Sequence, residues 1–253
     1  MLLCVDIGNT SIVLGLYDEK KLVQSFRLQT NIYQTSDEYA IKILSILDNN
    51  KINRNDIDGI MISSVVPQLD SVFSALCKKY FNIDAKFVVP GIRSGINIRI
   101  DNPKELGADL LVGAVGAVNK YGAPIIVIDM GTAITLVYVN KDKELLGGAI
   151  LPGLKTSFNA LFQKASKLEE VGIAKPNKVI GRDTVSSIQS GMTYGLASML
   201  DGIIKKMKEE QGEAKVVLTG GEARFIITSM EEEAIYDENL LLDGLRILYN
   251  KNK

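Results

Sequence analysis

The feature that most constrains this chain is a strand–turn–strand segment that occurs twice, the second time nearly half the chain after the first. Residues 2–14 and 125–137 align without gaps. Each reads as an apolar run, an Asp-x-Gly turn with small polar residues, and a second apolar run. A repeat on this scale indicates two domains built on one design. We therefore predict two domains, residues 1–118 and residues 119–253.

The pattern around the two copies supports this division. In each half, three β-rich runs come first, and helical patterns then alternate with further strands. Such alternation predicts an α/β protein in which each domain is a mixed sheet covered by helices. The expected strands are residues 2–5, 11–17, 22–28, 59–64, 85–89, 125–129, 134–138, 144–150 and 215–219, and the expected helices begin near residues 36, 67, 105, 154, 184 and 222.

The composition excludes several classes of protein. The 253 residues carry a formal net charge of -1, without the clustered basic excess that nucleic-acid surfaces show. No apolar run approaches the ~20 residues of a membrane span, and the amino terminus lacks the basic region of a signal peptide. Cys4 and Cys77 lie in apolar runs, as is typical of reduced core cysteines. We expect a cytoplasmic protein that binds neither nucleic acid nor membrane.

The chain contains no histidine. This absence excludes Ser-His-Asp and Cys-His catalysis and every histidine-based metal site. Any general base must therefore be a carboxylate, a lysine, a tyrosine or a cysteine.

The two Asp-x-Gly turns suit phosphate binding. Glycine lets backbone N–H groups approach an anion closely, and Thr10, Ser11 and Thr132 add hydroxyl donors. The carboxylates of Asp6 and Asp129 would repel phosphate unless a cation such as Mg²⁺ bridged them. Two such turns facing across a cleft would clamp one polyphosphate. The alternative is that each turn is only a structural hairpin.

A third short motif, Leu-Thr-Gly-Gly at residues 218–221, follows a β-rich run and precedes a helical pattern. Its glycines would let a flat adenine ring lie against the backbone, although an ordinary strand–helix turn has the same pattern. The usual nucleotide-binding signatures, the P-loop and the Rossmann glycine motif, are absent.

These three pieces, in this order, resemble the actin, hexokinase and Hsp70 superfamily of ATP-binding proteins. Within that superfamily, nearly the whole chain resembles the bacterial type III pantothenate kinases. The resemblance implies two ribonuclease H-like (actin-like) domains with an ATP cleft between them. It rests on residues 6–10, 63–67, 102–103, 107–109, 129–133, 147–153, 184, 187–191 and 219–221.

That family phosphorylates the hydroxyl of pantothenate with ATP, the first step of coenzyme A biosynthesis, and its members are homodimers. The resemblance implies Mg²⁺ and a monovalent cation, K⁺ or NH4⁺, with Asp109 as general base and Asp129 as the monovalent-cation ligand. It assigns ATP binding to Asp6, Ile7, Gly8, Asn9, Thr10, Ser11, Ile12, Val13 and Thr132. It assigns pantothenate binding to Ile100, Gly107, Ala108, Asp109, Leu110 and Thr184.

Some alternatives stay open. Leu110 and Ile100 stand where the family often has arginine and tyrosine, and a missing arginine removes a planar donor for the substrate. Arg93, Arg99 or a residue of a partner subunit are candidates to replace it. Asp109 could also be a first-turn carboxylate that the helix dipole stabilises. The protein could then be a catalytically weak paralogue acting as a regulator or binding protein, or an actin-fold kinase for another small alcohol.

Overall fold

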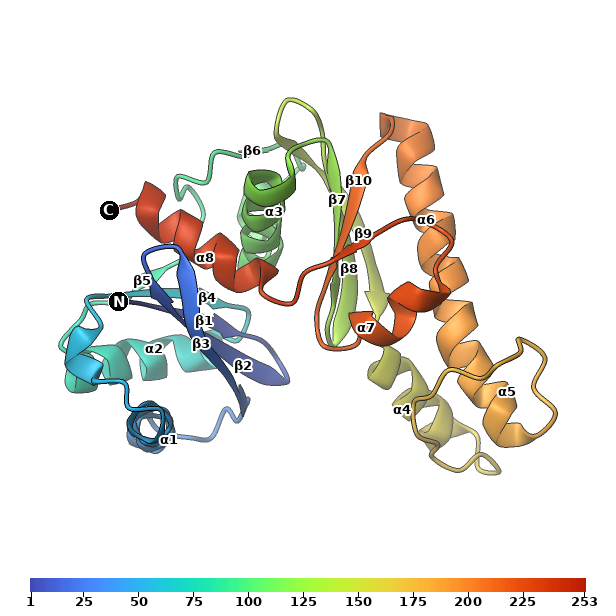
Figure 1. Cartoon of the computed structure of the whole chain (residues 1–253), viewed down its shortest axis with the longest axis horizontal. Helices are drawn as coiled ribbons and strands as arrows, with labels where there is room; N and C mark the ends of the chain where they lie inside the picture. The colour runs from blue at the N-terminus through green and yellow to red at the C-terminus, as the bar shows by residue number, and fades with distance from the viewer. The chain divides into compact units, whose positions relative to one another are not determined.

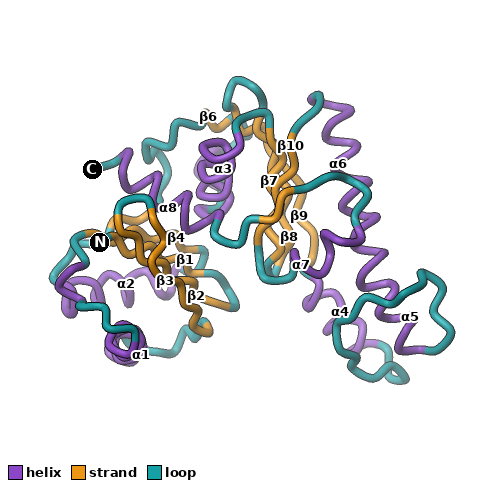
Figure 2. The backbone as a smooth tube through the Cα atoms, viewed as in Figure 1, coloured by secondary structure: helices purple, strands orange, loops and turns teal.

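Each strand–turn–strand segment lies within a mixed β-sheet of its own, and the two sheets belong to separate units of the chain (Figure 1). The computed structural model describes residues 1–253. The first unit contains residues 1–95, 102–116 and 241–253, and the second contains residues 96–101 and 117–240. Figure 2 shows that the strands of each unit gather in one group, with helices around it.

The first sheet has five strands in the order β3-β2-β1-β4-β5. β1 to β3 are antiparallel neighbours, whereas β4 runs parallel to β1 and β5 runs parallel to β4. All five strands expected in the first half are confirmed, although the last is short. Their bounds are β1 (Leu2–Ile7), β2 (Ser11–Asp18), β3 (Lys21–Gln29), β4 (Gly59–Ser64) and β5 (Lys86–Phe87).

One face of this sheet packs against two helices, α1 (Ser36–Asn49) and α2 (Pro67–Leu76). α1 begins at a capping box: the Thr35 hydroxyl accepts from the Glu38 N–H at 3.3 Å, and the Glu38 carboxylate accepts from the Thr35 N–H at 2.7 Å. α2 begins with a proline, whose missing N–H would have no helical partner there. The predicted starts of both helices are therefore confirmed.

The last helix, α8 (Leu240–Lys251), packs on the opposite face of the first sheet. Gly15 of β2 makes room for it, because a Cβ at that position would lie 2.7 Å from Leu242. The buried Tyr17 hydroxyl donates to Asp243 Oδ1 at 2.8 Å. The end of the chain is thus built into the sheet that the beginning of the chain forms.

The two units differ from the predicted domains 1–118 and 119–253, because the end of the chain belongs to the first unit. The division after Gly116 falls within α3 (Ala108–Tyr121), close to the predicted boundary, but residues 241–253 group with the first unit. No local pattern could indicate this, because α8 is an ordinary amphipathic helix whose partner is set only by tertiary packing.

Tyr17→Phe is expected to lower the free energy of unfolding by about 1–3 kcal/mol, because Asp243 loses a buried hydrogen-bond donor. Urea denaturation measures the change. Tyr33→Phe is the matched control, since the Tyr33 side chain is exposed. Equal losses in the two variants would show that this bond does not hold α8 to the sheet.

The second sheet has six strands in the order β11-β10-β7-β8-β9-β6. β7, β8 and β9 are antiparallel neighbours, and β10 runs parallel to β7. The two-residue edge strands β6 and β11 were not expected from the sequence. The bounds are β6 (Asn97–Ile98), β7 (Ile125–Met130), β8 (Ala133–Val139), β9 (Glu144–Pro152), β10 (Lys215–Thr219) and β11 (Ile235–Tyr236).

Helices cover one face of the second sheet and share its hydrophobic core. α5 and α6 run end to end through a π-helical turn, which confirms the helix expected from residue 184 (Figure 1). The helices are α4 (Leu154–Lys164), α5 (Thr184–Ser190), α6 (Leu196–Gln211) and α7 (Ala223–Ile226), with short 3-10 or π-helical turns at Arg54–Asp56, Cys77–Phe81, Pro103–Glu105, Gly191–Gly195 and Ile227–Ser229. None of the helices is long and apolar enough to cross a membrane.

Candidate active site

The first Asp-x-Gly turn joins β1 to β2 and is held by the residue that follows β3. The Gly8 N–H donates to Ser11 O at 3.1 Å and closes the turn. Thr30 binds it at two points: its N–H donates to Thr10 O at 3.0 Å and its hydroxyl donates to Gly8 O at 2.6 Å. Asn9 and Thr10 lie exposed at the tip. The turn is therefore a fixed backbone loop with polar residues at its outer edge.

The predicted ATP-binding residues of this segment differ in their exposure. Ile7 and Ile12 are fully buried in the core of the first unit, so only their backbone could reach a ligand. Asp6 and Val13 are half-buried and lie opposite each other on β1 and β2. On its other side, Asp6 pairs with Ser63 of the parallel strand β4.

The second turn joins β7 to β8 and is held in a similar way. The Gly131 N–H donates to Ala133 O at 3.1 Å. The Gly153 N–H and the Thr156 hydroxyl both donate to Thr132 O, at 3.0 and 2.8 Å. As in the first turn, the residue after the third strand supports the loop. The side chain of Thr132 is exposed.

The two turns differ in length. Asp6 pairs with Val13, whereas Asp129 pairs with Thr135, so the first turn has one residue more. The alignment of residues 2–14 with 125–137 therefore holds for β1 and β7 but slips by one position after the turn. Sequence alone could not show this, because both second strands begin with residues that fit either register.

The Thr-Gly-Gly motif lies directly beside the second turn. β10 runs parallel to β7 and pairs Thr219 with Asp129. Gly220 has a φ of 95°, and a Cβ there would lie 2.4 Å from Met130 O. Only glycine fits this position, because both its backbone conformation and the close approach of the neighbouring strand exclude a side chain.

Three residues near the turns were not among the predicted site residues. Nothing in the sequence around Thr30 distinguishes it from an ordinary residue at the end of a strand. Glu222 follows the glycine pair, and its Oε1 lies 3.6 Å from Lys155 Nζ at the start of α4. Burial raises the pKa of Glu222, although Lys155 opposes the shift. Such contacts between distant segments leave no local sequence signal.

Asp109 lies in the first turn of α3, and its Oδ1 accepts a hydrogen bond from the Leu110 N–H at 2.8 Å. Gly107 leaves space for this carboxylate, because a Cβ there would lie 2.5 Å from Oδ1. Burial raises the pKa of the carboxyl, against the lowering effect of the hydrogen bond. The helix dipole acts in the opposite direction and lowers the pKa of a first-turn carboxylate, so burial is the dominant influence here. A raised pKa is compatible with a proton acceptor, and structural burial alone also produces it.

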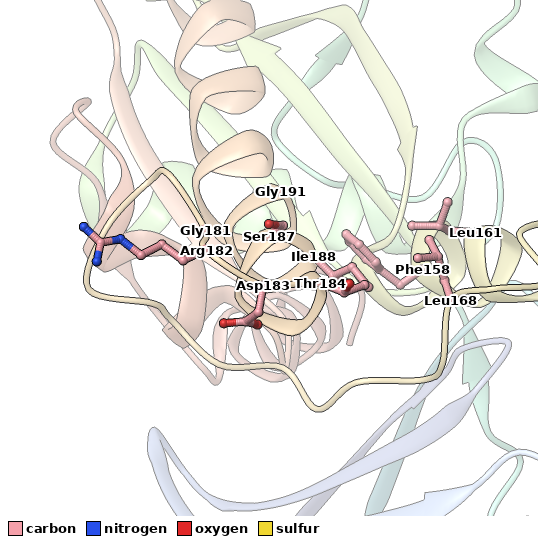
Figure 3. Close-up of a pocket in the computed structure, with 10 residues that line it drawn as sticks. All are labelled: Phe158, Leu161, Leu168, Gly181, Arg182, Asp183, Thr184, Ser187, Ile188 and Gly191. Atoms are coloured by element: carbon pink, nitrogen blue, oxygen red, sulfur yellow. The ribbon is translucent and has the colours of Figure 1, made fainter.

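An open pocket of about 770 Å³ lies in the second unit, lined by α4, α5 and the loop between them (Figure 3). Thr184, a predicted substrate contact, is the first residue of α5 and lines this pocket. Figure 3 shows its side chain near Phe158 and Ile188, whereas the Arg182 side chain points away. The pocket is thus mainly apolar with a hydroxyl at its wall.

The other predicted substrate-binding residues are divided between the two units. Residues 107–110 lie in the first unit, whereas Ile100 and Thr184 lie in the second. Ile100 is half-buried, and its Cγ2 lies 4.0 Å from the position of a Cβ on Gly147. Arg99, a candidate to replace the missing arginine, has its Nε 2.9 Å from Glu144 Oε1, so that guanidinium already has an anionic partner.

Comparison with known proteins identifies the family. The sequence profile of the type III pantothenate kinases matches residues 2–206. The chain belongs to the type III pantothenate kinase family. Type III pantothenate kinases from Halalkalibacterium halodurans and Exiguobacterium sibiricum are 46% and 45% identical to it over 253 residues, with 100% of each chain covered. The resemblance seen in the sequence motifs is therefore confirmed.

Solved structures show the same fold at low sequence identity. Component A of (R)-2-hydroxyglutaryl-CoA dehydratase from Acidaminococcus fermentans aligns with a TM-score of 0.59 and 17% identity, covering 100% of this chain and 99% of that chain. The inorganic polyphosphate/ATP-glucomannokinase from Arthrobacter sp. strain KM aligns with a TM-score of 0.52 and 13% identity, covering 99% and 98%. These likenesses concern the fold alone, and they confirm the predicted class of two actin-like α/β domains.

A type III pantothenate kinase uses ATP, which normally arrives with a divalent cation. No group of three or more Asp, Glu or Cys side chains forms a metal cage in this protein. Mg²⁺ commonly takes only one or two carboxylates, together with phosphate oxygens and water. Single carboxylates beside the two turns, Asp6 and Asp129, fit that requirement.

Proposed function

We propose that this type III pantothenate kinase transfers the γ-phosphoryl group of ATP to the hydroxyl of pantothenate, with Asp109 as general base. Family membership over nearly the whole chain supports the reaction. The observation that carries the assignment of the base is the Asp109 carboxyl, whose pKa is raised by burial at the start of α3. In a chain without histidine, such a carboxylate is well suited to accept the hydroxyl proton.

In this proposal the first turn binds the phosphates of ATP. Residues 6–13 supply backbone N–H groups and the exposed side chains of Asn9 and Thr10, and Thr132 of the second turn adds a hydroxyl. Mg²⁺ would neutralise the phosphate charge when it is bound, and the proposal gives Asp6 the role of holding it. Phosphoryl transfer of this kind depends mainly on positioning and charge stabilisation, which a hydrogen-bonded turn provides.

The proposal assigns Asp129 to a monovalent cation, K⁺ or NH4⁺, and the working protein to a homodimer. Apolar side chains next to the Thr184 pocket support an interface there, since Val179, Ile180 and Val185 are all exposed in the single chain. Light scattering tests this point, and a mass of twice the 27.6 kDa of one chain is expected.

Substrate binding is proposed for Thr184, Ile100 and residues 107–110. Leu110 supplies no charge to bind the pantothenate carboxylate, and Arg99 is paired with Glu144. The positively charged side chain that binds this carboxylate must therefore belong to another residue of the chain or of a partner subunit. Alternatively, the site binds a substrate that has an uncharged group in place of the carboxylate.

A coupled assay with ATP, Mg²⁺ and K⁺ tests the proposed function. ADP formation is expected to depend on pantothenate and to saturate with it. Pantetheine, in which an amide replaces the carboxylate, is the matched control, and faster turnover of pantetheine would favour the kinase for another small alcohol. Absence of turnover, together with absence of pantothenate binding by calorimetry, would contradict the proposal.

A further inference from the structure

Three side-chain hydroxyl oxygens are buried without a partner in the fold, those of Ser63, Thr219 and Ser229. Ser229 is itself only half-buried, whereas the other two residues are buried. Ser63 and Thr219 are 0% and 1% exposed, and neither side-chain oxygen makes a hydrogen bond within the protein. An unpaired buried hydroxyl costs about 1–3 kcal/mol. Native proteins rarely keep one unless a ligand, an ion or a water molecule satisfies it.

The two hydroxyls occupy equivalent positions in the two sheets. Ser63 is the last residue but one of β4, which runs parallel to β1, and it pairs with Asp6; Thr219 is the last residue of β10, which runs parallel to β7, and it pairs with Asp129. Side chains in register on neighbouring parallel strands point to the same face. Each hydroxyl therefore shares its sheet face with a carboxylate, at the carboxyl ends of parallel strands, where ligands of α/β sheets bind.

The same face is the one turned away from the main core of each unit. Ile62 and Leu218 immediately precede the two hydroxyl residues and belong to the two core clusters. Because successive strand residues point to opposite faces, Ser63 and Thr219 point away from those clusters. The two hydroxyls therefore lie outside the main hydrophobic core of each unit.

The neighbouring serine shows what a purely structural hydroxyl does here. Ser64 Oγ accepts from the Val66 N–H at 3.2 Å and so fixes the bend between β4 and α2. Ser63, one residue earlier, has no such role. The sequence Ser-Ser-Val-Val-Pro at residues 63–67 thus contains one serine that the fold explains and one that it does not.

We propose that Ser63 and Thr219 are cation-site residues. Each hydroxyl oxygen, together with the carboxylate of the paired aspartate, binds a hard cation directly or through a water of its hydration shell. Hydroxyl, carboxylate and water oxygens are the ligands that Mg²⁺ and similar hard cations take. The inference rests on the proposed function in one respect, namely that the pair with Asp6 takes the divalent cation and the pair with Asp129 the monovalent one.

Thr219→Val tests the second pair, because valine keeps the shape and removes only the hydroxyl. Without added cation the variant is expected to melt at or above the temperature of the unmodified protein, since an unpaired polar group has been removed. Added K⁺ is expected to raise the melting temperature of the unmodified protein but not that of the variant. Calorimetry with K⁺ alone, at ionic strength held constant with tetramethylammonium, is expected to show that Thr219→Val binds K⁺ about 10- to 100-fold more weakly than the unmodified protein does.

Ser63→Ala is expected to have the corresponding effect on stabilisation by Mg²⁺ alone. Two control variants remove buried or half-buried hydroxyls that do have partners. Thr193→Val loses the bond to Ala174 O at 3.3 Å, and Ser64→Ala loses the bond from Val66. Both controls are expected to melt at lower temperatures in every condition while keeping the cation responses.

The proposal is overturned if Thr219→Val keeps the full response to K⁺ and Ser63→Ala keeps the full response to Mg²⁺. It is also overturned if neither cation changes the melting temperature of the unmodified protein. None of these measurements contains pantothenate or depends on turnover. A protein that failed the kinase assay could therefore still pass this test, and an active kinase could fail it.

Discussion

Asp109→Asn is expected to lower kcat for pantothenate phosphorylation by about 100- to 10,000-fold, the usual contribution of a positioned general base. Asparagine keeps the shape of the side chain and an oxygen that can accept from the Leu110 N–H, as Asp109 Oδ1 does at 2.8 Å. It cannot take a proton from the substrate hydroxyl. ATP affinity is expected to stay unchanged, because the proposed phosphate contacts lie in the two turns, at residues 6–13 and at Thr132, and not at Asp109.

The same variant is expected to be more stable than the unmodified protein at neutral pH. Burial raises the pKa of Asp109, so the folded state holds this proton more tightly than the unfolded state does. The stability of the unmodified protein therefore falls as pH rises from the unfolded pKa, about 3.9, through the folded pKa. Asparagine has no charge to bury, so the advantage of the variant should disappear at pH values below that range.

Steady-state kinetics, calorimetry with ATP and thermal denaturation as a function of pH measure these effects together. Asp18→Asn is the control, because Asp18 is an exposed carboxylate at the end of β2. A turnover close to that of the control would contradict the assignment of Asp109 as base. A loss of stability at neutral pH would instead favour a carboxylate that stabilises the helix start.

The parts of the fold that the sequence predicted are those with long local patterns. β1 to β4, β7 to β10 and the helices beginning at Ser36, Pro67 and Thr184 all carry periodic apolar residues or capping signals over several positions. β6 and β11 have two residues each, too few for any periodicity. The last helix was expected to begin near residue 222, where α7 has only four residues, and α8 was not predicted as a separate helix. Its docking on the first sheet depends on small residues such as Gly15, far away in the sequence.

The residues of the candidate site divide in the same way, into those with a local sequence pattern and those without one. Asp6, Asp109 and Asp129 could be predicted because each stands in a short motif at a strand or helix end. The support given by Thr30 and the unpaired state of Ser63 could not, because both depend on which strands become neighbours. Sequence patterns therefore suggested the proposed site carboxylates, whereas the contacts that support the turns emerged only from the sheet register.

Gly153→Ala is expected to disrupt the second turn, with a loss of about 3 kcal/mol of stability, the upper end of the range for overpacking. Gly153 has φ −61° and ψ 162°, which alanine can also adopt, so the effect is steric rather than conformational. A Cβ would lie 2.2 Å from Gly131 O and 2.6 Å from Thr132 O. These are backbone atoms of the turn, so the turn itself must move, and Thr132 O would lose the bond from the Gly153 N–H.

Substitutions at two other glycines distinguish an effect on stability from an effect on ligand binding. A Cβ on Gly131 would make only an ordinary contact, 3.5 Å from Ala133 O, and a Cβ on Gly172 would meet nothing within 4 Å. Gly131→Ala is expected to remain stable but to bind ATP about 10-fold more weakly, because the added methyl group keeps phosphate from the backbone. Gly172→Ala is expected to change neither property, and Gly153→Ala to reduce both. Chemical denaturation and ATP calorimetry on the three variants measure this, and a Gly153→Ala protein as stable as Gly172→Ala would show that the turn is not held by this contact.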